Sequence, residues 1–334
     1  MNNYEIVTDF EGLERISAKK QIPFTGSIEI ITKCNFNCIH CYIPEHVNQM
    51  DTEIIFQTID AMKKMGIFEL TLTGGEIFLH KDIMQIIEYA RKKGMRVTLF
   101  SNISLIDEII AKRLSELYIS EISTTIFSLD GEINDRITQK SGSLFKILKA
   151  IEYIKKYNIE LEIKVPIMKQ NKNAYSKIRE FCKNNKIKVS YSTAITQRTN
   201  GDKEPCKYKL DFDECCEWYK YNDSKIARRP FGIEEHMCNA ICNSVHIDVN
   251  GNVYPCISFP YIIGNIYAND LYSIWKKSDE RKRLLMLKKK DLKSCTKCEL
   301  KEYCVRCPGL AYAENGDMLG CSTIDREIAI ARQW

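Results

Sequence analysis

The chain has 334 residues, enough for two domains, and its 44% hydrophobic and 28% charged residues are typical of a soluble globular protein. No apolar run is long enough to cross a bilayer, and the first twenty residues lack the apolar stretch of a signal peptide, so we expect a cytoplasmic protein without a membrane partner. Fifteen cysteines in such a chain favour metal or redox centres over a disulfide framework.

Strand and helix patterns alternate along the first two thirds of the chain. After a lead-in that we expect to be irregular (residues 1–23), the expected strands lie at 27–32, 68–73, 96–102, 121–128, 159–167 and 187–192. The expected helices lie at 52–66, 82–93, 106–117, 144–154 and 175–184. This alternation predicts an α/β fold with a parallel sheet and helices outside it. Six strand–helix units fall short of the eight that close a barrel.

The first expected strand leads directly into a short loop with three cysteines. Cys34, Cys38 and Cys41 are separated by three and two residues. Iron–sulfur clusters normally take four cysteines, and structural zinc sites also close with four ligands. Three thiolates can therefore hold three irons of a cubane cluster and leave the fourth iron open to a substrate or cofactor. The alternative is a zinc site completed by His40 or His46.

The second expected strand runs into Gly74-Gly75-Glu76. A C-x3-C-x2-C loop after the first strand and a GGE segment after the second resemble the radical SAM superfamily, which implies a partial (β/α)6 TIM-like barrel. In that family S-adenosylmethionine (AdoMet) chelates the open iron, and an electron from the cluster cleaves it to a 5′-deoxyadenosyl radical. The resemblance implies that Gly74, Gly75 and Glu76 receive the methionine amine. Two glycines allow a ligand close to the backbone, and a carboxylate suits an ammonium group.

Further polar residues follow the later strands, where the chemistry of such folds collects. Asn102 ends the third expected strand, and residues 128–131 (SLDG) follow the fourth. The SLDG segment resembles one common in the peptide-modifying branch of the family. By that resemblance Ser128 and Arg136 hold the carboxylate of the methionine moiety, and His40 supplies a backbone contact to adenine. For Asn102 and Arg136 the alternative is an ordinary polar role in a loop.

The alternation stops near residue 200. Residues 201–235 are expected to form a connector with one helix at Phe212–Tyr221, which could lie over the open barrel. Four cysteines have no place in the cluster motifs, and we expect them to be inert, although a connector thiol that donates a hydrogen atom is the alternative. They are Cys182, in a helix pattern and expected to be buried, and Cys206, Cys215 and Cys216 in the connector.

The last third of the chain has eight cysteines, enough for two closed four-thiolate centres. Their arrangement, with a G-x4-C segment at residues 251–256, resembles the SPASM extension of radical SAM enzymes, a small cysteine-rich domain with two auxiliary [4Fe–4S] clusters. One departure is the spacing of the last close pair, which is two residues where the family usually has three. The family's connectivity implies an inner cluster on Cys238, Cys242, Cys256 and Cys307 and an outer cluster on Cys295, Cys298, Cys304 and Cys321. A zinc site within residues 295–307 is the alternative.

Together these features predict a lead-in (residues 1–24), a radical SAM partial barrel (25–200), the connector (201–235) and a SPASM-type domain (236–334). Three [4Fe–4S] clusters and AdoMet are the expected cofactors. The net charge of +5 would suit nucleic acid, but roughly five negative charges from the clusters would bring the loaded protein close to neutral, so no such partner is expected.

The resemblance implies an enzyme that abstracts a hydrogen atom from a peptide or protein side chain, as in the maturation of ribosomally made peptides by thioether or carbon–carbon crosslinks, or in residue oxidation. The expected partners are that substrate and an electron donor of the flavodoxin or ferredoxin type. Only about 24 residues precede the barrel, so leader recognition would fall to the barrel mouth, the connector or a separate leader-binding protein. The alternatives are a radical enzyme for a small molecule such as a tetrapyrrole and a non-enzymatic metal-binding protein.

Overall fold

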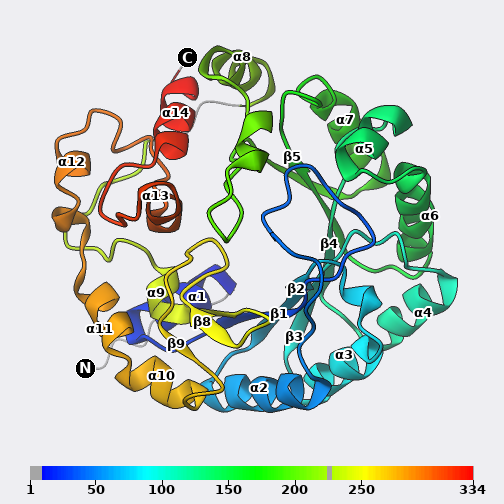
Figure 1. The fold of residues 1–334 in the computed structure, drawn as a ribbon, viewed down its shortest axis with the longest axis horizontal. Coiled ribbons are helices and arrows are strands. Elements are labelled where there is room, and N and C mark those ends of the chain that lie inside the picture. The colour runs from blue at the N-terminus through cyan, green and yellow to red at the C-terminus, as the bar shows by residue number, and fades with distance from the viewer. Residues whose placement is uncertain (1–9, 224–227, 334) are drawn as a thin grey trace.

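The computed structural model describes residues 10–223 and 228–333. Its centre is a sheet in which six parallel strands stand side by side in chain order (Figure 1). These strands are β1 (Thr25–Ile31), β2 (Glu69–Gly74), β3 (Arg96–Phe100), β4 (Glu121–Thr125), β5 (Leu161–Pro166) and β6 (Lys188–Ser192). The sheet curves without closing, which confirms the predicted partial barrel.

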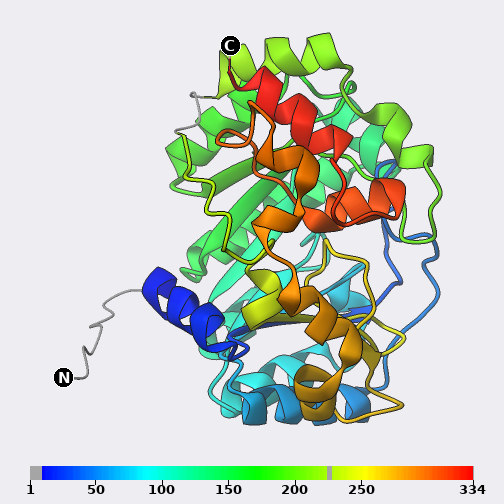
Figure 2. The ribbon, with the colours of Figure 1, turned by 90° about the vertical axis from the view of Figure 1, so that its left-hand side faces the viewer.

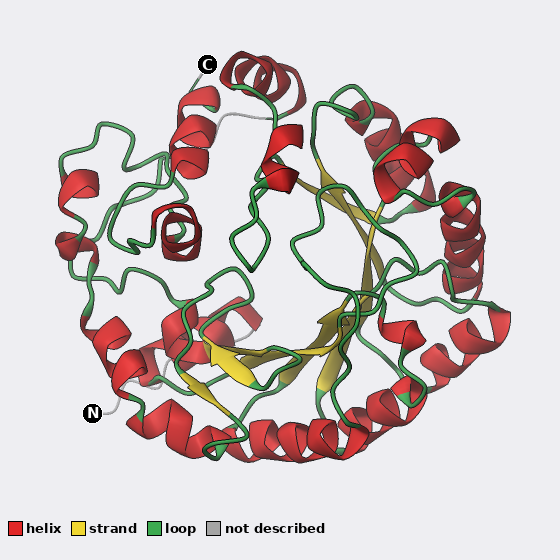
Figure 3. Cartoon of the chain, viewed as in Figure 1, coloured by secondary structure: helices red, strands yellow, loops and turns green. Residues whose placement is uncertain are grey.

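Helices cover the outer side of the curved sheet (Figure 3). They are α2 (Thr52–Met65), α3 (Ile83–Lys92), α4 (Glu108–Glu116), α5 (Gly131–Thr138), α6 (Ser143–Lys156) and α7 (Tyr175–Asn185). Helix α5 was not among the predicted elements. It begins at Asp130, whose side chain accepts a hydrogen bond from the N–H of Ile133, and such a cap stabilises a helix too short to show a clear apolar period.

The two faces of the strands differ in polarity. In β1, Ile28 and Ile30 are fully buried in the main core, on the side where Gly26 packs against α2. Ser27 and Glu29 alternate with them and therefore point into the barrel. Polar residues in the interior of a barrel leave room for ligands as well as for packing.

The segment before β1 was predicted to be irregular, and this prediction is wrong. The segment contains helix α1 (Phe10–Lys20). Residues far along the chain hold it. The side-chain amide of Asn243 donates to the Glu14 carbonyl and the Ser17 hydroxyl, and the indole of Trp275 donates to the Gln21 carbonyl. The local sequence contains no sign of these partners. The remainder of the lead-in, residues 1–9, lies outside the described residues.

The sheet continues beyond β1 into the cysteine-rich part of the chain. Strand β7 (Ser244–Ile247) pairs parallel to β1, and β8 (Asn252–Tyr254) and β9 (Gly264–Asn265) follow antiparallel. Figure 2 shows the rest of this segment along one side of the barrel. It contains helices α9 (Ala240–Asn243), α10 (Leu271–Lys277), α11 (Asp279–Met286), α12 (Lys293–Thr296), α13 (Pro308–Asn315) and α14 (Thr323–Ala331).

The connector helix α8 (Phe212–Asn222) lies where the pattern predicted a helix, behind a capping box of Asp211 and Glu214. It packs against α14 and, through Trp218, against Tyr175 and Tyr191 at the β6 edge of the sheet. The connector thus covers the free edge of the last barrel strand. Among the described residues, no helix is long and apolar enough to cross a membrane.

Candidate active site

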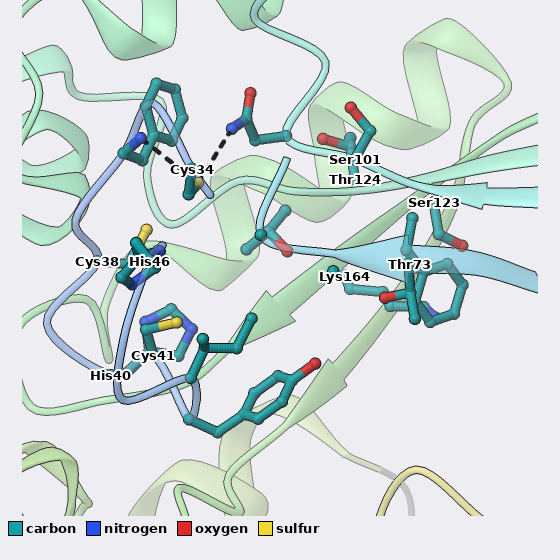
Figure 4. A pocket seen from close by; sticks show the side chains of 18 of the residues that line it. Cys34, Cys38, His40, Cys41, His46, Thr73, Ser101, Ser123, Thr124 and Lys164 are labelled. Atoms are coloured by element: carbon teal, nitrogen blue, oxygen red, sulfur yellow. Dashed lines mark hydrogen bonds between the residues drawn. The ribbon is translucent and has the colours of Figure 1, made fainter. Parts of the chain in front are cut away.

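The three cysteines of the first motif line one cavity of about 300 Å³ at the carboxyl ends of the strands. We call it the triplet cavity. Figure 4 shows the thiols with His40 and His46 on one side and Thr73, Ser123 and Lys164 from the strands on the other. This places the triplet loop, the barrel interior and room for a ligand together.

Helix α5 positions the loop that carries the triplet. The N–H groups of Asn37 and Ile39 donate to the carbonyls of Thr138 and Ile137, at the end of that helix. The side chain of Asn102 donates to Asn35 Oδ1 at 2.8 Å and lies 3.8 Å from Cys34 Sγ. The loop is therefore held from two sides by backbone and amide groups.

The triplet cysteines are half-buried, in surroundings where a bare thiolate is disfavoured. Burial raises the pKa of Cys34 to about 11, opposed by the N–H of Phe36, and burial also raises the pKa values of Cys38 and Cys41. The positive charge of a bound metal would offset the cost of burying the negative charge of a thiolate. The donor set therefore fits a cluster on three thiolates.

The two glycines of the GGE segment allow it to lie against the start of the triplet loop. A Cβ on Gly74, whose φ is +147°, would stand 2.0 Å from the Ile31 carbonyl oxygen, and one on Gly75 would stand 2.4 Å from the Lys33 carbonyl oxygen. The N–H groups of Gly75 and Glu76 donate to those same two carbonyls at 2.8 Å. Only residues without a side chain permit this approach, and both glycines line the triplet cavity.

The carboxylate of Glu76 is fully buried and is not among the groups that line the triplet cavity. It accepts hydrogen bonds from the N–H of Phe78 at 3.0 Å, the Ser101 hydroxyl at 2.8 Å and the N–H of Asn102 at 2.7 Å. Burial raises its pKa to about 7, and these bonds oppose the rise. The carboxylate thus fixes the Ser101–Asn102 turn that borders the cavity, and the contact of Glu76 with the methionine amine stays a prediction.

Of the other predicted AdoMet contacts, His40 and Asn102 line the triplet cavity, whereas Ser128 and Arg136 do not. His40 is half-buried and packs against Phe127 with ring centroids 5.0 Å apart, and burial of the ring lowers its pKa to about 4, so the ring is neutral. Ser128 lines a different cavity, and its hydroxyl accepts the N–H of Asp130. Arg136 lies exposed on α5 because the neighbouring position 137 occupies the buried face of that helix.

The structure adds Lys164 to the site, a residue that the sequence analysis missed. Its ammonium lies 3.8 Å from the centroid of the Phe100 ring and 3.6 Å from the carboxylate of Glu162, and it is the only Lys or Arg among the described residues that line the triplet cavity. Lys164 occupies a polar position in the alternating β5 pattern, so it points into the barrel. The alternation was visible in the sequence, but the sequence did not show that the polar face of this strand lines a cavity.

The structure brings the four outer cysteines together. The thiol of Cys304, which has its pKa raised to about 12 mainly by burial, is also influenced by Cys295, Cys298 and Cys321. Burial raises the pKa of Cys295, and the charges of Cys298 and Cys321 add to this rise. The charges of the four thiols that the family resemblance groups thus influence one another, and the outer cluster on them stays a prediction.

Three of the four inner cysteines also form a group. Burial raises the pKa of Cys238 to about 11, and Cys256 and Cys307 contribute to that rise. The thiol of Cys242 is buried on α9, where burial raises its pKa and the charges of Arg281 and Lys288 oppose the rise; no influence of another cysteine on it is found among the described residues. The inner cluster on these four cysteines stays a prediction.

Asp325 connects the two cysteine groups and has no counterpart in the motifs. Its carboxylate accepts the N–H of Cys307 at 2.7 Å, and its carbonyl lies 3.8 Å from Cys304 Sγ. Burial raises its pKa to about 6. Because α14 contributes this residue, the last helix holds the ends of both cysteine groups in place.

Comparison with known proteins agrees with the motifs. The family model of the radical SAM superfamily matches residues 28–183, and the model of the SPASM iron–sulfur cluster-binding domain matches residues 238–299. The chain has a radical SAM domain followed by a SPASM domain. The predicted resemblance is confirmed, and with it an enzyme that binds iron–sulfur clusters and AdoMet, whereas the non-enzymatic alternative is not supported.

This radical SAM enzyme resembles relatives with different printed activities. The AdoMet-dependent heme synthase of Methanosarcina barkeri is 24% identical over 87% of this chain and 93% of its own. The subtilosin biosynthesis protein AlbA of Bacillus subtilis is 24% identical over 76% of this chain and 60% of its own. Among solved structures, Streptococcus suis SuiB bound to S-adenosylmethionine has a TM-score of 0.71 at 18% identity, covering 97% of this chain and 84% of that one. This last likeness shows the fold.

Replacing Glu76 with Gln is expected to weaken AdoMet binding and to lower the melting temperature. A side-chain amide would turn one acceptor oxygen into a donor facing the N–H of Phe78 or of Asn102. A buried polar group left without a partner costs roughly 1–3 kcal/mol. Calorimetric titration with AdoMet and thermal denaturation of the anaerobically reconstituted protein measure the two effects.

The matched control is Arg136→Ala, which removes an exposed side chain and should leave both quantities unchanged. Weaker AdoMet binding by the Arg136 variant would support the contact between Arg136 and the AdoMet carboxylate that the family resemblance implies. Unchanged binding and stability in the Glu76→Gln protein would contradict the positioning role of that carboxylate.

Proposed function

We propose that this enzyme uses a cluster on Cys34, Cys38 and Cys41 to cleave AdoMet and modifies a side chain of a peptide or protein. When bound, such a cluster supplies the electron that breaks the sulfonium bond. The observation that carries the choice of a peptide is the charge of the cavities. Among the described residues, Lys164 is the only Lys or Arg that lines the triplet cavity. A second cavity shares Tyr42, Ile43 and Ile257 with it, and the described residues that line this second cavity include three carboxylates and no Lys or Arg.

The chain's own residues would orient AdoMet and substrate. The backbone at Gly74 and Gly75 and the side chain of Asn102 border the space beside the three thiols, so we assign the methionine moiety to them. His40, neutral and packed on Phe127, would form the wall for adenine. Thr73, Ser123 and Lys164 then remain for the substrate, on the strand side of the cavity.

The net reaction that we propose is balanced as follows. The deoxyadenosyl group takes a hydrogen atom from a carbon of the substrate and leaves as 5′-deoxyadenosine, while methionine is released. A new bond to a second atom of the substrate then forms with loss of one proton and one electron. We assign two auxiliary clusters to Cys238, Cys242, Cys256 and Cys307 and to Cys295, Cys298, Cys304 and Cys321; they would accept this electron.

The second candidate is chemistry on a tetrapyrrole, which the heme synthases among the relatives favour. A porphyrin with several carboxylate side chains would need basic groups around it, because buried carboxylates require partners. Apart from Lys164, the described residues of the two joined cavities provide no Lys or Arg. A solved structure of SuiB with its precursor peptide SuiA has a TM-score of 0.73 to this chain at 17% identity, so a fold of this kind accommodates a peptide.

The test incubates the anaerobically reconstituted enzyme with AdoMet and dithionite. One reaction contains a pool of short synthetic peptides with deuterated side chains, and the other contains iron coproporphyrin III. We expect deuterium in 5′-deoxyadenosine and a peptide that has lost two hydrogen atoms, with no change in the porphyrin. Turnover of the porphyrin alone would overturn the proposal. The physiological electron donor that we propose, a flavodoxin or ferredoxin, should replace dithionite, and a separate leader-binding protein should raise the yield.

A further inference from the structure

A second cavity of about 420 Å³ is lined by residues of β1, of the β7–β8 hairpin and of the segment 42–48 that follows the triplet. It shares Tyr42, Ile43 and Ile257 with the triplet cavity, so the two spaces adjoin. A group bound in the second cavity would therefore lie beside the space that we assign to AdoMet and substrate. We call this second space the acidic cavity.

The described residues that line the acidic cavity include three carboxylates, Glu29, Glu45 and Asp248, and no Lys or Arg. His246 adds no positive charge, because burial lowers its pKa to about 4 and the Ser27 hydroxyl lies 2.8 Å from its Nδ1. The cavity is therefore negative wherever its carboxylates are ionised.

The carboxylate of Asp248 has partners that explain it. It accepts the N–H groups of Asn250 and Asn252 at 2.9 Å and the Tyr254 hydroxyl at 2.8 Å. These bonds build the turn between β7 and β8, where Gly251 has a positive φ. Asp248 thus stabilises the hairpin, and its carboxylate oxygens already have hydrogen-bond donors.

Glu29 is different. Its residue is 8% exposed, and within the described part of the chain its carboxylate has neither a hydrogen bond nor an ion pair. Burial, and then the nearby charge of Asp248, raise its pKa to about 7. A buried carboxylate without a partner is costly, and a cationic ligand would supply the missing partner.

We propose that the acidic cavity is a subsite for the positively charged end of a basic side chain in the peptide substrate, held by Glu29. This deepens the proposed function and rests on it. The ammonium or guanidinium group would bond to the Glu29 carboxylate, and the chain that carries it would run past Tyr42 and Ile257 into the triplet cavity.

The test measures binding without turnover. The reconstituted enzyme with AdoMet and no reductant is titrated with Nα-acetyl-lysine-N-methylamide and with its norleucine analogue, which has a side chain of similar shape without charge. We expect the lysine amide to bind about tenfold or more tightly, as a charge-assisted bond provides, and Glu29→Gln to abolish this preference. Glu217→Gln, a change of the same kind on the exposed face of α8, should leave the preference intact.

Equal binding of the two amides, binding of neither, or a lysine preference that survives in Glu29→Gln would each overturn the subsite. Loss of folding is not expected to obscure the result, because the Glu29→Gln change removes a buried charge and its repulsion from Asp248, and a melting temperature no lower than that of the wild type at pH 8 checks this. The two proposals fail separately. A lysine preference with turnover of the porphyrin alone would end the peptide proposal and leave the cation subsite in place.

Discussion

Replacing Cys34, Cys38 and Cys41 together with Ala should reduce the formation of 5′-deoxyadenosine to the level of a reaction without protein. These thiols are the only cysteines that line the triplet cavity, so no other described thiol can hold an iron beside AdoMet. The iron content of the anaerobically reconstituted protein should fall from about twelve to about eight, since each cubane has about four irons. Iron analysis and chromatography of the quenched reaction measure both.

The control for this variant is Cys216→Ala, which removes a thiol of the connector helix outside the cysteine groups and should retain all the iron and activity. Two results would contradict the assignment. Deoxyadenosine formed by the triple variant at the wild-type rate would place the cleaving cluster elsewhere. A wild-type protein that fills with zinc and holds at most one cluster would end the proposal of two auxiliary clusters.

The barrel could be predicted because its signals are local. The alternation in Leu161–Pro166 and the apolar spacing in Thr52–Met65 are complete within single elements, and both elements lie where the pattern placed them. Helix α1 and strand β7 could not be predicted in this way. The first depends on Asn243 and Trp275, and the second extends a sheet that begins more than two hundred residues earlier.

The site was predicted to the extent that its residues form contiguous motifs. The triplet loop and the GGE segment lie together because neighbouring parallel strands end at one edge of the sheet. The roles of single side chains were less accessible. Glu76 bonds to a turn of the next strand, which no spacing shows, and Arg136 is turned outward by the helical phase of α5.

Glu29 and Lys164 illustrate a further limit. Both were visible as polar positions in alternating strands, and alternation alone is equally consistent with a solvent-facing side of a sheet. Only the curvature of the partial barrel around them, with helices on the outer face, makes them interior groups. The grouping of Cys295, Cys298, Cys304 and Cys321 was predictable through family resemblance, whereas Asp325, which ties this group to Cys307, has no motif of its own.

Replacing Cys298 with Ala should separate cleavage of AdoMet from modification of the substrate. Cys298 belongs to the outer cysteine group, and no outer cysteine lines the triplet cavity, so the variant should retain reductant-driven formation of 5′-deoxyadenosine. The proposed auxiliary clusters would take up the electron that is released when the new bond forms. Without the outer cluster we therefore expect deoxyadenosine without modified peptide, a loss of product of about a hundredfold or more, equivalent to roughly 3 kcal/mol.

Folding is the main confounding factor in this experiment, because metal ligation in small domains also contributes to stability. The Cys298 variant must first be soluble and retain the cluster on the triplet, as shown by iron content and by the spectrum of the reduced cluster with AdoMet. Glu299→Ala, an exposed neighbour in the same segment, is the matched control and should give full product. Full product from the Cys298 variant would show that turnover does not need the outer cluster. Loss of deoxyadenosine formation despite an intact first cluster would show that Asp325 and α14 couple the cysteine groups to the barrel. We expect cleavage of AdoMet without modified peptide.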